Sequence, residues 1–215
     1  AASQAGTQRD LEDIAQDCYN LFEICKVQHL NDSAAYWIEL RANLDTTNVE
    51  WLLEAGNFVF NFLSYIDKAK TYYHTALSAA QLSNNAELIA NCYNDIGYMY
   101  SNIGEFDKAI DNLELSIKIR ESISESDAPS FTNSYSNLGF CYSILGQYDK
   151  ALKLFETALS ILQQNYGEHN LEVALSFNNI GLIHFNMGQT IESLKYFYKA
   201  LDTQIDIIGE NSRDV

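Results

Sequence analysis

The sequence predicts an all-α protein, a solenoid of nine or more helices arranged as antiparallel pairs. Three observations support this fold class. Similar segments recur at intervals of 42 residues, apolar residues within them are spaced as on one face of a helix, and a single proline interrupts the 215-residue chain. A fixed period of about 20–50 residues is typical of stacked arrays, in which each repeat packs against its neighbours.

Each repeat contains two helical patterns. In the first, apolar side chains follow one another at steps of three and four residues, as at Tyr135, Leu138 and Tyr142, so they share one helical face. A glycine such as Gly146 follows, and we expect it to be the N-cap of the second helix. Small residues recur where the two helices should cross, and large side chains such as Phe155 should fill the space opposite.

This pattern resembles the tetratricopeptide repeat (TPR) family, whose signature is matched by Tyr135, Leu138, Gly139, Tyr142, Ala151, Phe155 and Ala158. The usual repeat has about 34 residues, and the longer period here resembles the repeats of kinesin light chain and related scaffolds. Neighbouring repeats depart from the signature at Leu113, Ser116, His184 and Ser193. The resemblance covers residues 50–215. It implies a TPR solenoid, which is a right-handed superhelix of antiparallel helix pairs and serves protein–protein interaction.

The predicted organisation follows the repeats along the chain. Residues 1–8 are expected to be a disordered or artificial start, and residues 9–47 a degenerate helix pair that caps the array. Four repeats follow within 48–208, at about 48–85, 86–128, 129–170 and 171–208. Residues 209–215 align with the start of the fourth repeat, so we expect a truncated fifth repeat and a fragment of a larger protein.

The composition restricts the classes of partner. The net charge of −16 argues against nucleic acids, whose phosphates attract clustered Lys and Arg, and against anionic membrane surfaces. No apolar segment approaches the length of a membrane span. We therefore expect no nucleic acid and no membrane as partners. The acidic residues are interpreted as a solvated outer face, with a basic protein partner as the alternative.

The sequence predicts no enzyme. Cys18, Cys25, Cys92 and Cys141 form no Cys-x-x-Cys pair and lie in apolar helical patterns, as packed free thiols do in a reducing compartment. The histidines lack metal-ligand spacing, and no nucleophile motif or phosphate-binding loop appears. We therefore expect no catalytic residue, no cofactor, no metal site and a cytoplasmic location.

A stripe of amides and apolar residues runs along the first helix of each repeat, opposite the partner helix. An Asn side chain can both donate to and accept from a peptide group, and these amides are similar to the asparagine ladders with which several TPR scaffolds hold peptide backbones. The alternative is that they only solvate the groove. The predicted peptide-binding residues are Asn61, Asp95, Tyr98, Asn102, Asn137, Phe140, Asn179, Leu182 and Asn186.

Three functions are consistent with this stripe and with the chain's C-terminal end. The first is a scaffold that binds an extended peptide or partner segment in the concave groove. The second is self-association, with copies stacking through the uncapped C-terminal repeat. The third is the peptide-sensing arm of a bacterial regulator, which would use the same groove. Lys and Arg are absent from the stripe, so it lacks the charged clamp that holds a C-terminal carboxylate.

Overall fold

The computed structural model describes residues 2–123 and 129–211, and every regular element within these ranges is helical. This confirms the predicted all-α fold. None of the helices described combines the length and the apolar character needed to span a membrane. The elements are α1 (Ala2–Val27), α2 (Asn31–Leu44), α3 (Val49–Leu63), α4 (Ile66–Leu82), α5 (Ala86–Asn102), α6 (Phe106–Ile123), the 3-10 turn η1 (Pro129–Phe131), α7 (Thr132–Ile144), α8 (Tyr148–Tyr166), α9 (Leu171–Asn186) and α10 (Thr190–Asn211).

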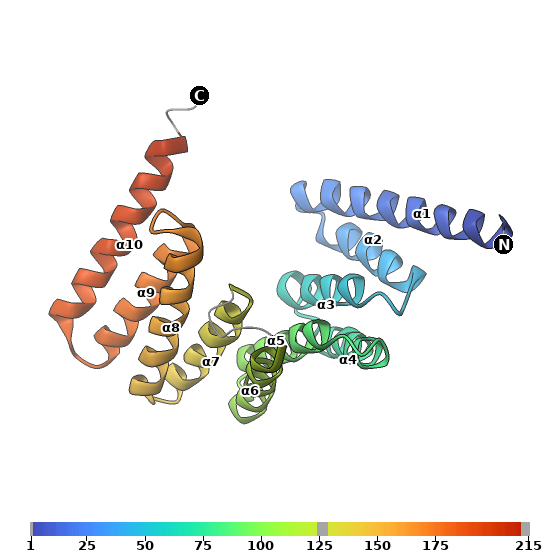
Figure 1. Cartoon of the computed structure of the whole chain (residues 1–215). Coiled ribbons are helices and arrows are strands. Elements are labelled where there is room, and N and C mark those ends of the chain that lie inside the picture. Colours follow the sequence, from blue (N-terminus) through green and yellow to red (C-terminus); the bar gives the residue numbers. More distant parts are fainter. Residues whose placement is uncertain (1, 124–128, 212–215) are drawn as a thin grey trace. The chain divides into compact units, whose positions relative to one another are not determined.

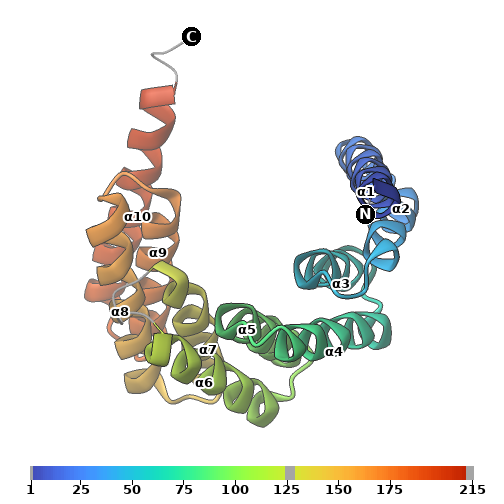
Figure 2. The same ribbon diagram turned by 45° about the vertical axis from the view of Figure 1, so that its right-hand side comes forward.

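The chain divides into two compact units, and the division falls within α5. Unit 1 is Ala1–Met99 and unit 2 is Tyr100–Val215. In unit 1, α1 lies against α2, α2 against α3 and α3 against α4 (Figures 1 and 2). Fully buried side chains such as Ile38, Val59 and Tyr73 form its core.

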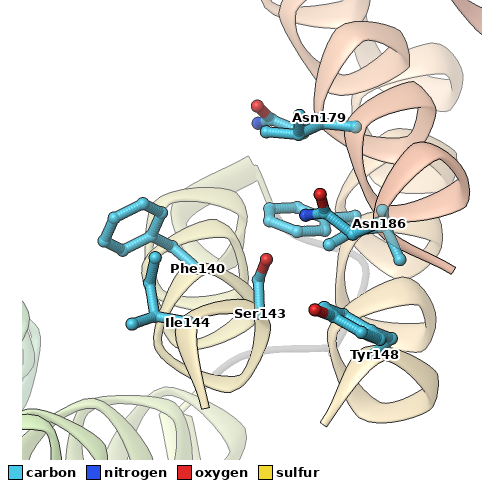
Figure 3. Close-up of a pocket in the computed structure, with 9 residues that line it drawn as sticks. Phe140, Ser143, Ile144, Tyr148, Asn179 and Asn186 are labelled. Atoms are coloured by element: carbon cyan, nitrogen blue, oxygen red, sulfur yellow. The ribbon is translucent and has the colours of Figure 1, made fainter. Parts of the chain in front are cut away.

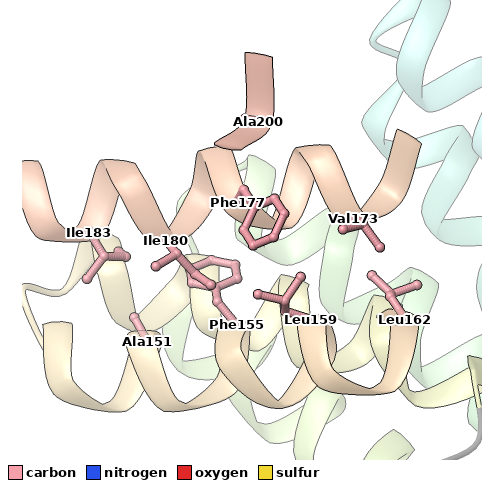
Figure 4. Packing of buried hydrophobic residues seen from close by; sticks show 9 residues of the cluster. All are labelled: Ala151, Phe155, Leu159, Leu162, Val173, Phe177, Ile180, Ile183 and Ala200. Atoms are coloured by element: carbon pink, nitrogen blue, oxygen red, sulfur yellow. The ribbon is translucent and has the colours of Figure 1, made fainter. Parts of the chain in front are cut away.

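In unit 2 the packing also follows the sequence, with α6 against α7, α7 against α8, α8 against α9 and α9 against α10. One apolar cluster packs α8 against α9 and also includes Ala200 of α10 (Figure 4). Its buried members are Ala151, Phe155, Leu159, Leu162, Val173, Phe177, Ile180, Ile183 and Ala200.

In the last three repeats the first helix ends at a glycine, as predicted: Gly104, Gly146 and Gly188 each follow it with a positive φ. At the end of α7, the N–H of Gln147 donates to the Tyr142 carbonyl at 2.8 Å, and the N–H of Gly146 donates to the Ser143 carbonyl at 3.0 Å. These are the two bonds of a Schellman motif. Gly146 has a φ of 72°, which glycine adopts at little cost because it has no Cβ. The N-cap of α8 is therefore Gln147, and the prediction of Gly146 was wrong.

Small residues do lie where paired helices cross, as predicted. A Cβ atom at Gly139 would stand 3.1 Å from Cζ of Phe155, and one at Gly181 would stand 2.8 Å from the Phe197 ring. In unit 1, a Cβ at Gly56 would stand 2.8 Å from Cε1 of Tyr73. The backbone of each of these first helices therefore rests on an aromatic ring of its partner helix.

The structure differs from the expected boundaries at both ends. Helix α1 already begins at Ala2, so residues 2–8 are helical instead of disordered. Alanine and glutamine in this segment are strong helix formers and no proline interrupts it. Helix α10 continues past Gly209 to Asn211, where a new connector was expected. Residues 212–215 of the expected fifth repeat lie outside the described range.

Candidate functional site

In unit 1, the predicted stripe is held by hydrogen bonds within the protein. Asn57 on α3 donates from Nδ2 to the Asp95 carboxylate on α5 at 3.0 Å, and its Oδ1 accepts from the Tyr73 hydroxyl at 2.7 Å. Tyr73 is fully buried, and this burial, together with the negative charge of Asp95, raises the pKa of its phenol. Both ends of the Asn57 amide therefore have partners.

Asn61 and Tyr98 contact each other further along the same two helices. The Tyr98 hydroxyl donates to Oδ1 of Asn61 at 3.4 Å, and the Tyr98 ring packs edge-on against Phe60 with 6.1 Å between ring centroids. Three predicted residues, Asn61, Asp95 and Tyr98, thus lie on the facing helices α3 and α5. Asn102, the last residue of α5, is exposed.

In unit 2, the predicted stripe borders a pocket of about 280 Å³ between α7, α8 and α9 (Figure 3). Four predicted residues line it: Phe140, Asn179, Leu182 and Asn186. The other lining residues are Ser143, Ile144, Tyr148, Phe155 and Ile183. Figure 3 shows Phe140 and Ile144 on one side, Asn179 and Asn186 on the other and Tyr148 beneath them. Asn137 is half-buried on α7 and is not a lining residue.

Two of the lining residues, Tyr148 and Phe155, come from α8 and were not predicted as site residues. The sequence pattern assigned both to the packing between paired helices, and Phe155 is indeed almost completely buried. It reaches the pocket because Gly139 presents no side chain above its ring. Gly139 could have indicated this from the sequence, because a residue without a side chain leaves the ring packed against it accessible to the pocket.

The amides of the pocket are available to a ligand. Within residues 2–123 and 129–211, the side chains of Asn179 and Asn186 make no hydrogen bond. Asn179 is half-buried and Asn186 is exposed. Beside them, Phe140 and Leu182 are 46% and 47% exposed, which is high for large apolar side chains. The pocket thus combines amide donors and acceptors with apolar walls.

The lining of the pocket is uncharged, because it contains no Asp, Glu, Lys or Arg. On α7, Cys141 belongs to a buried cluster with Ala109 and Leu113 of α6. Burial raises the pKa of its thiol to about 11, which keeps this thiol protonated and unreactive at neutral pH. In the described part of the chain, no group of three His, Cys, Asp or Glu residues is placed to hold a metal ion. The site can therefore offer hydrogen bonds and apolar contacts.

Comparison of the sequence with protein families gives two matches, and both carry the description Tetratricopeptide repeat. One covers residues 89–129 and the other residues 130–206. Together they account for more than half of the chain. No curated protein matches the sequence.

Solved structures with the same fold include BtubC (BKLC) from P. vanneervenii, with a TM-score of 0.76 and 16% identity over 95% of this chain and 91% of that one. Nearly identical TPR-like repeats of a kinesin light chain from Podosopora anserina give a TM-score of 0.65 and 15% identity, covering 92% of this chain and 95% of theirs. A Rap protein complexed with Competence and Sporulation Factor gives 0.76 and 15%, and the match covers 92% of this chain and 56% of Rap.

At these identities the solved structures establish the fold alone, which is a solenoid of helical repeats. Such solenoids are scaffolds that present extended surfaces to other proteins. The family matches, the repeat glycines and the helix pairs agree with one another, and they show that this chain belongs to the tetratricopeptide repeat family.

Proposed function

We propose that the chain is an interaction scaffold that binds an extended segment of a partner protein at the unit 2 pocket. One observation carries this proposal. Asn179 and Asn186, whose side chains make no hydrogen bond to any described residue, share a pocket with the exposed apolar side chains of Phe140 and Leu182. Backbone amides and an apolar side chain of a bound segment would match these groups.

The spacing of the two amides suits an extended backbone. Asn179 and Asn186 are seven residues apart on α9, which is about 10 Å along the helix axis. About three residues of an extended chain cover the same length. Each amide provides one acceptor and two donors, so it can pair with both groups of a peptide unit whatever the side chain is. A segment held by both amides would run along α9 at this point.

The space between the amides suits a side chain better than a large cofactor. Its volume of about 280 Å³ lies below the range of about 300–1,000 Å³ that is common for small-molecule pockets. Phe140, Leu182 and Phe155 supply apolar walls. We therefore expect the bound segment to place an apolar residue here, between the two backbone contacts.

Charge would act on the approach of the partner and not inside the pocket. The chain carries a net charge of −16, while the pocket lining is uncharged. An acidic surface raises the association rate of a basic partner, and salt screens this effect. A basic partner should accordingly bind faster at low salt, with little change in its dissociation rate.

Two other functions remain candidates. Self-association through the C-terminal repeat is favoured by exposed apolar side chains on α10. A sensing arm of a regulator would use the same pocket as a scaffold and differ in the domains attached to it. The likeness to Rap, solved with Competence and Sporulation Factor, concerns the fold at 15% identity. It therefore favours neither the scaffold nor the sensing arm.

The proposal is tested with peptides selected from a random display library against the wild-type chain. Selected peptides are titrated calorimetrically against wild type and against the double variant Asn179→Ala/Asn186→Ala. Each net hydrogen bond contributes about 0.5–1.5 kcal/mol, so losing up to four should cost about 2–4 kcal/mol, or about 30-fold to 1,000-fold in affinity. Stability should barely change, because these amides bond to no described residue.

A matched control is Asn61→Ala, which removes an amide of the same stripe in unit 1, where Tyr98 already contacts it. This control should leave peptide affinity unchanged. If selected peptides bind wild type and the double variant equally while both are folded, the pocket is not the binding site. If they lack an apolar residue in common, the assigned role of Phe140 and Leu182 is wrong.

A further inference from the structure

Helix α10 carries an exposed apolar stripe that none of its own packing uses. Its members are between 49% and 83% exposed, and they follow one another alternately at three and four residues: Ile191, Leu194, Tyr198, Leu201, Ile205 and Ile208. This spacing is that of heptad positions a and d, the seam of a coiled coil. The stripe extends along about five helical turns.

The residues at the a positions (Ile191, Tyr198 and Ile205, the a row) and those at the d positions (Leu194, Leu201 and Ile208, the d row) have different origins. The a row is not apolar in the equivalent helices nearer the N-terminus. Ile191, Tyr198 and Ile205 stand 42 residues after the polar residues Asp149, Glu156 and Gln163 of α8. A further 42 residues back, α6 carries Asp107, Glu114 and Glu121. All six of these polar side chains are exposed or half-buried. A second helix of this array is therefore polar along the a row unless something covers it.

The d row has a different explanation, since it is also apolar in α8 and, at Ile110 and Ile117, in α6. Leu194 and Leu201 correspond to Leu152 and Leu159 of α8, which pack into the cluster that joins α8 to α9. A stacked repeat would therefore cover the d row of α10 and leave the a row in water. Covering both rows together requires a helix that lies along α10.

We propose that α10 pairs with α10 of a second copy of this chain, antiparallel and around a twofold axis. Apolar residues at a and d positions form the seam between paired helices of a coiled coil, and every a and d position of this stripe holds Ile, Leu or Tyr. A twofold interface uses the same surface on both copies, so the stripe as a whole needs only itself as a complement: the a row of one copy packs against the d row of the other. In this register Tyr198 of one copy packs beside Leu201 of the other.

The charges that flank the stripe favour the antiparallel arrangement. Lys195 and Asp202 occupy the e positions, and both are exposed. In the antiparallel pair, Lys195 lies between Leu194 and Tyr198 along the helix and faces Asp202 of the second copy. Because the two copies are related by a twofold axis, this ion pair forms twice. Lys195 now pairs only with its own neighbour Glu192, at 3.3 Å among the described residues.

A parallel pairing would lack these ion pairs. Its e positions would face g positions, which are Phe197 and Gln204 and carry no charge. Phe197 also packs within its own unit, because its ring lies under Gly181. The g side of α10 is thus occupied and the e side is open, which agrees with a partner approaching from the e side.

The occupancy of the stripe is tested by sedimentation equilibrium of the whole chain over a range of concentrations, at moderate salt because copies with a charge of −16 repel each other. Wild type should dimerise. The variant Ile191→Asp/Tyr198→Glu/Ile205→Gln, which carries the residue types of α8, should be monomeric and should keep the helical content of wild type, measured by circular dichroism. Its melting temperature should not depend on concentration, whereas that of wild type should rise with concentration. A wild type that stays monomeric at every concentration overturns the proposal.

The orientation is tested by exchanging the two charges. Lys195→Glu and Asp202→Lys should each weaken dimerisation about tenfold, because each turns two attractive pairs into repulsive ones. The double variant should dimerise like wild type. The antiparallel arrangement would be overturned if the single variants dimerise as strongly as wild type, or if the double variant does not recover the wild-type dimerisation constant.

A control variant tests whether dimerisation is specific to α10, and peptide affinity separates the dimer proposal from the proposal for the unit 2 pocket. Leu82→Ser, at a residue of unit 1 that is 88% exposed, should leave the dimer intact. If it disrupts association as strongly, the dimer is not formed by α10. None of the stripe residues lines the unit 2 pocket, so the α10 variants should keep wild-type peptide affinity, and either proposal can fail without the other.

Discussion

The inner faces of unit 1 and unit 2 occupy the same positions of the repeat but have different chemistry. In unit 1 the residue after the repeat glycine is Asn57, and it bonds to Asp95 on the next inner helix. In unit 2 the equivalent residue is Phe140, and it lies with Asn179, the equivalent of Asp95, in the pocket lining. Two polar residues that bond to each other in unit 1 are thus replaced in unit 2 by an apolar residue and an amide.

The second helix of each pair, α4 in unit 1 and α8 in unit 2, adds to the difference in hydrogen bonding between the two units. Tyr73 in unit 1 and Phe155 in unit 2 are equivalent, and both lie under the repeat glycine. The Tyr73 hydroxyl closes the network by donating to Asn57, whereas Phe155 has no hydroxyl and its ring lines the pocket. Under the proposed function, the amides would serve as a binding surface only in unit 2, where the neighbouring positions leave their hydrogen-bonding groups unused.

The largest expected effect comes from transferring the unit 1 network into unit 2. The variant Phe140→Asn/Phe155→Tyr/Asn179→Asp should reproduce the bonds of Asn57, Tyr73 and Asp95 and close the pocket. Because it removes an apolar wall and an available amide together, peptide affinity should fall by about 100-fold or more, measured by calorimetry. Phe185→Ser is the control, since this exposed residue of α9 does not line the pocket. Unchanged affinity in the folded triple variant would contradict the comparison.

Thiol alkylation compares how firmly the cores of the two units are packed. Burial, with the charge of Asp95, raises the pKa of Cys92 in unit 1 to about 12, and burial raises that of Cys141 in unit 2 to about 11. Only the thiolate reacts, so at pH 8 Cys141 should react about 100-fold more slowly than an ordinary thiol, and Cys92 more slowly still. Both rates should rise as the pH rises toward these values.

Peptide mapping by mass spectrometry after iodoacetamide treatment gives both rates, with the half-buried Cys25 as an internal reference. Reaction of Cys92 or Cys141 at the rate of Cys25 would show that its helix opens in the native state, and would identify which unit opens first.

Gly139→Leu should destabilise unit 2 by about 1–3 kcal/mol, the usual cost of overpacking. A side chain at this position would collide with Phe155, which stands 3.1 Å from the position of a Cβ. Thermal unfolding followed by circular dichroism measures the loss. Gly146→Ala is the control because a Cβ there meets nothing within 4 Å, so only its left-handed φ is strained. A melting temperature that does not change in Gly139→Leu would show that α7 and α8 do not cross closely.

The smallest expected effect contrasts an amide of unit 1 that is hydrogen-bonded with an amide of unit 2 that is not. Asn57→Ala removes the partner of the buried Tyr73 hydroxyl and should cost about 1–2 kcal/mol of unfolding free energy. Asn179→Ala breaks no bond to a described residue and should change stability by less than about 0.5 kcal/mol. Urea unfolding monitored by circular dichroism measures both. Equal losses would mean that Asn179 stabilises the fold as much as Asn57 does.

The fold was predictable because its signals are local and repeated. The glycine at 139, with Phe155 expected opposite, already indicates a close helix crossing, and the structure places these residues in contact. The state of each amide was not predictable, because it depends on a side chain far away in the sequence. Asn57 meets Asp95 across 38 residues and Asn61 meets Tyr98 across 37, and repeat periodicity alone does not say whether such a pair bonds.

Most packed helix pairs within each unit are consecutive in sequence, and this affects how the chain acquires its structure. Only short loops have to close, which costs little chain entropy. Proteins rich in such local contacts fold in about microseconds to milliseconds, whereas synthesis proceeds at about 5–20 residues per second. Helices α1 to α4 can therefore be packed on a translating ribosome seconds before α9 and α10 have been made.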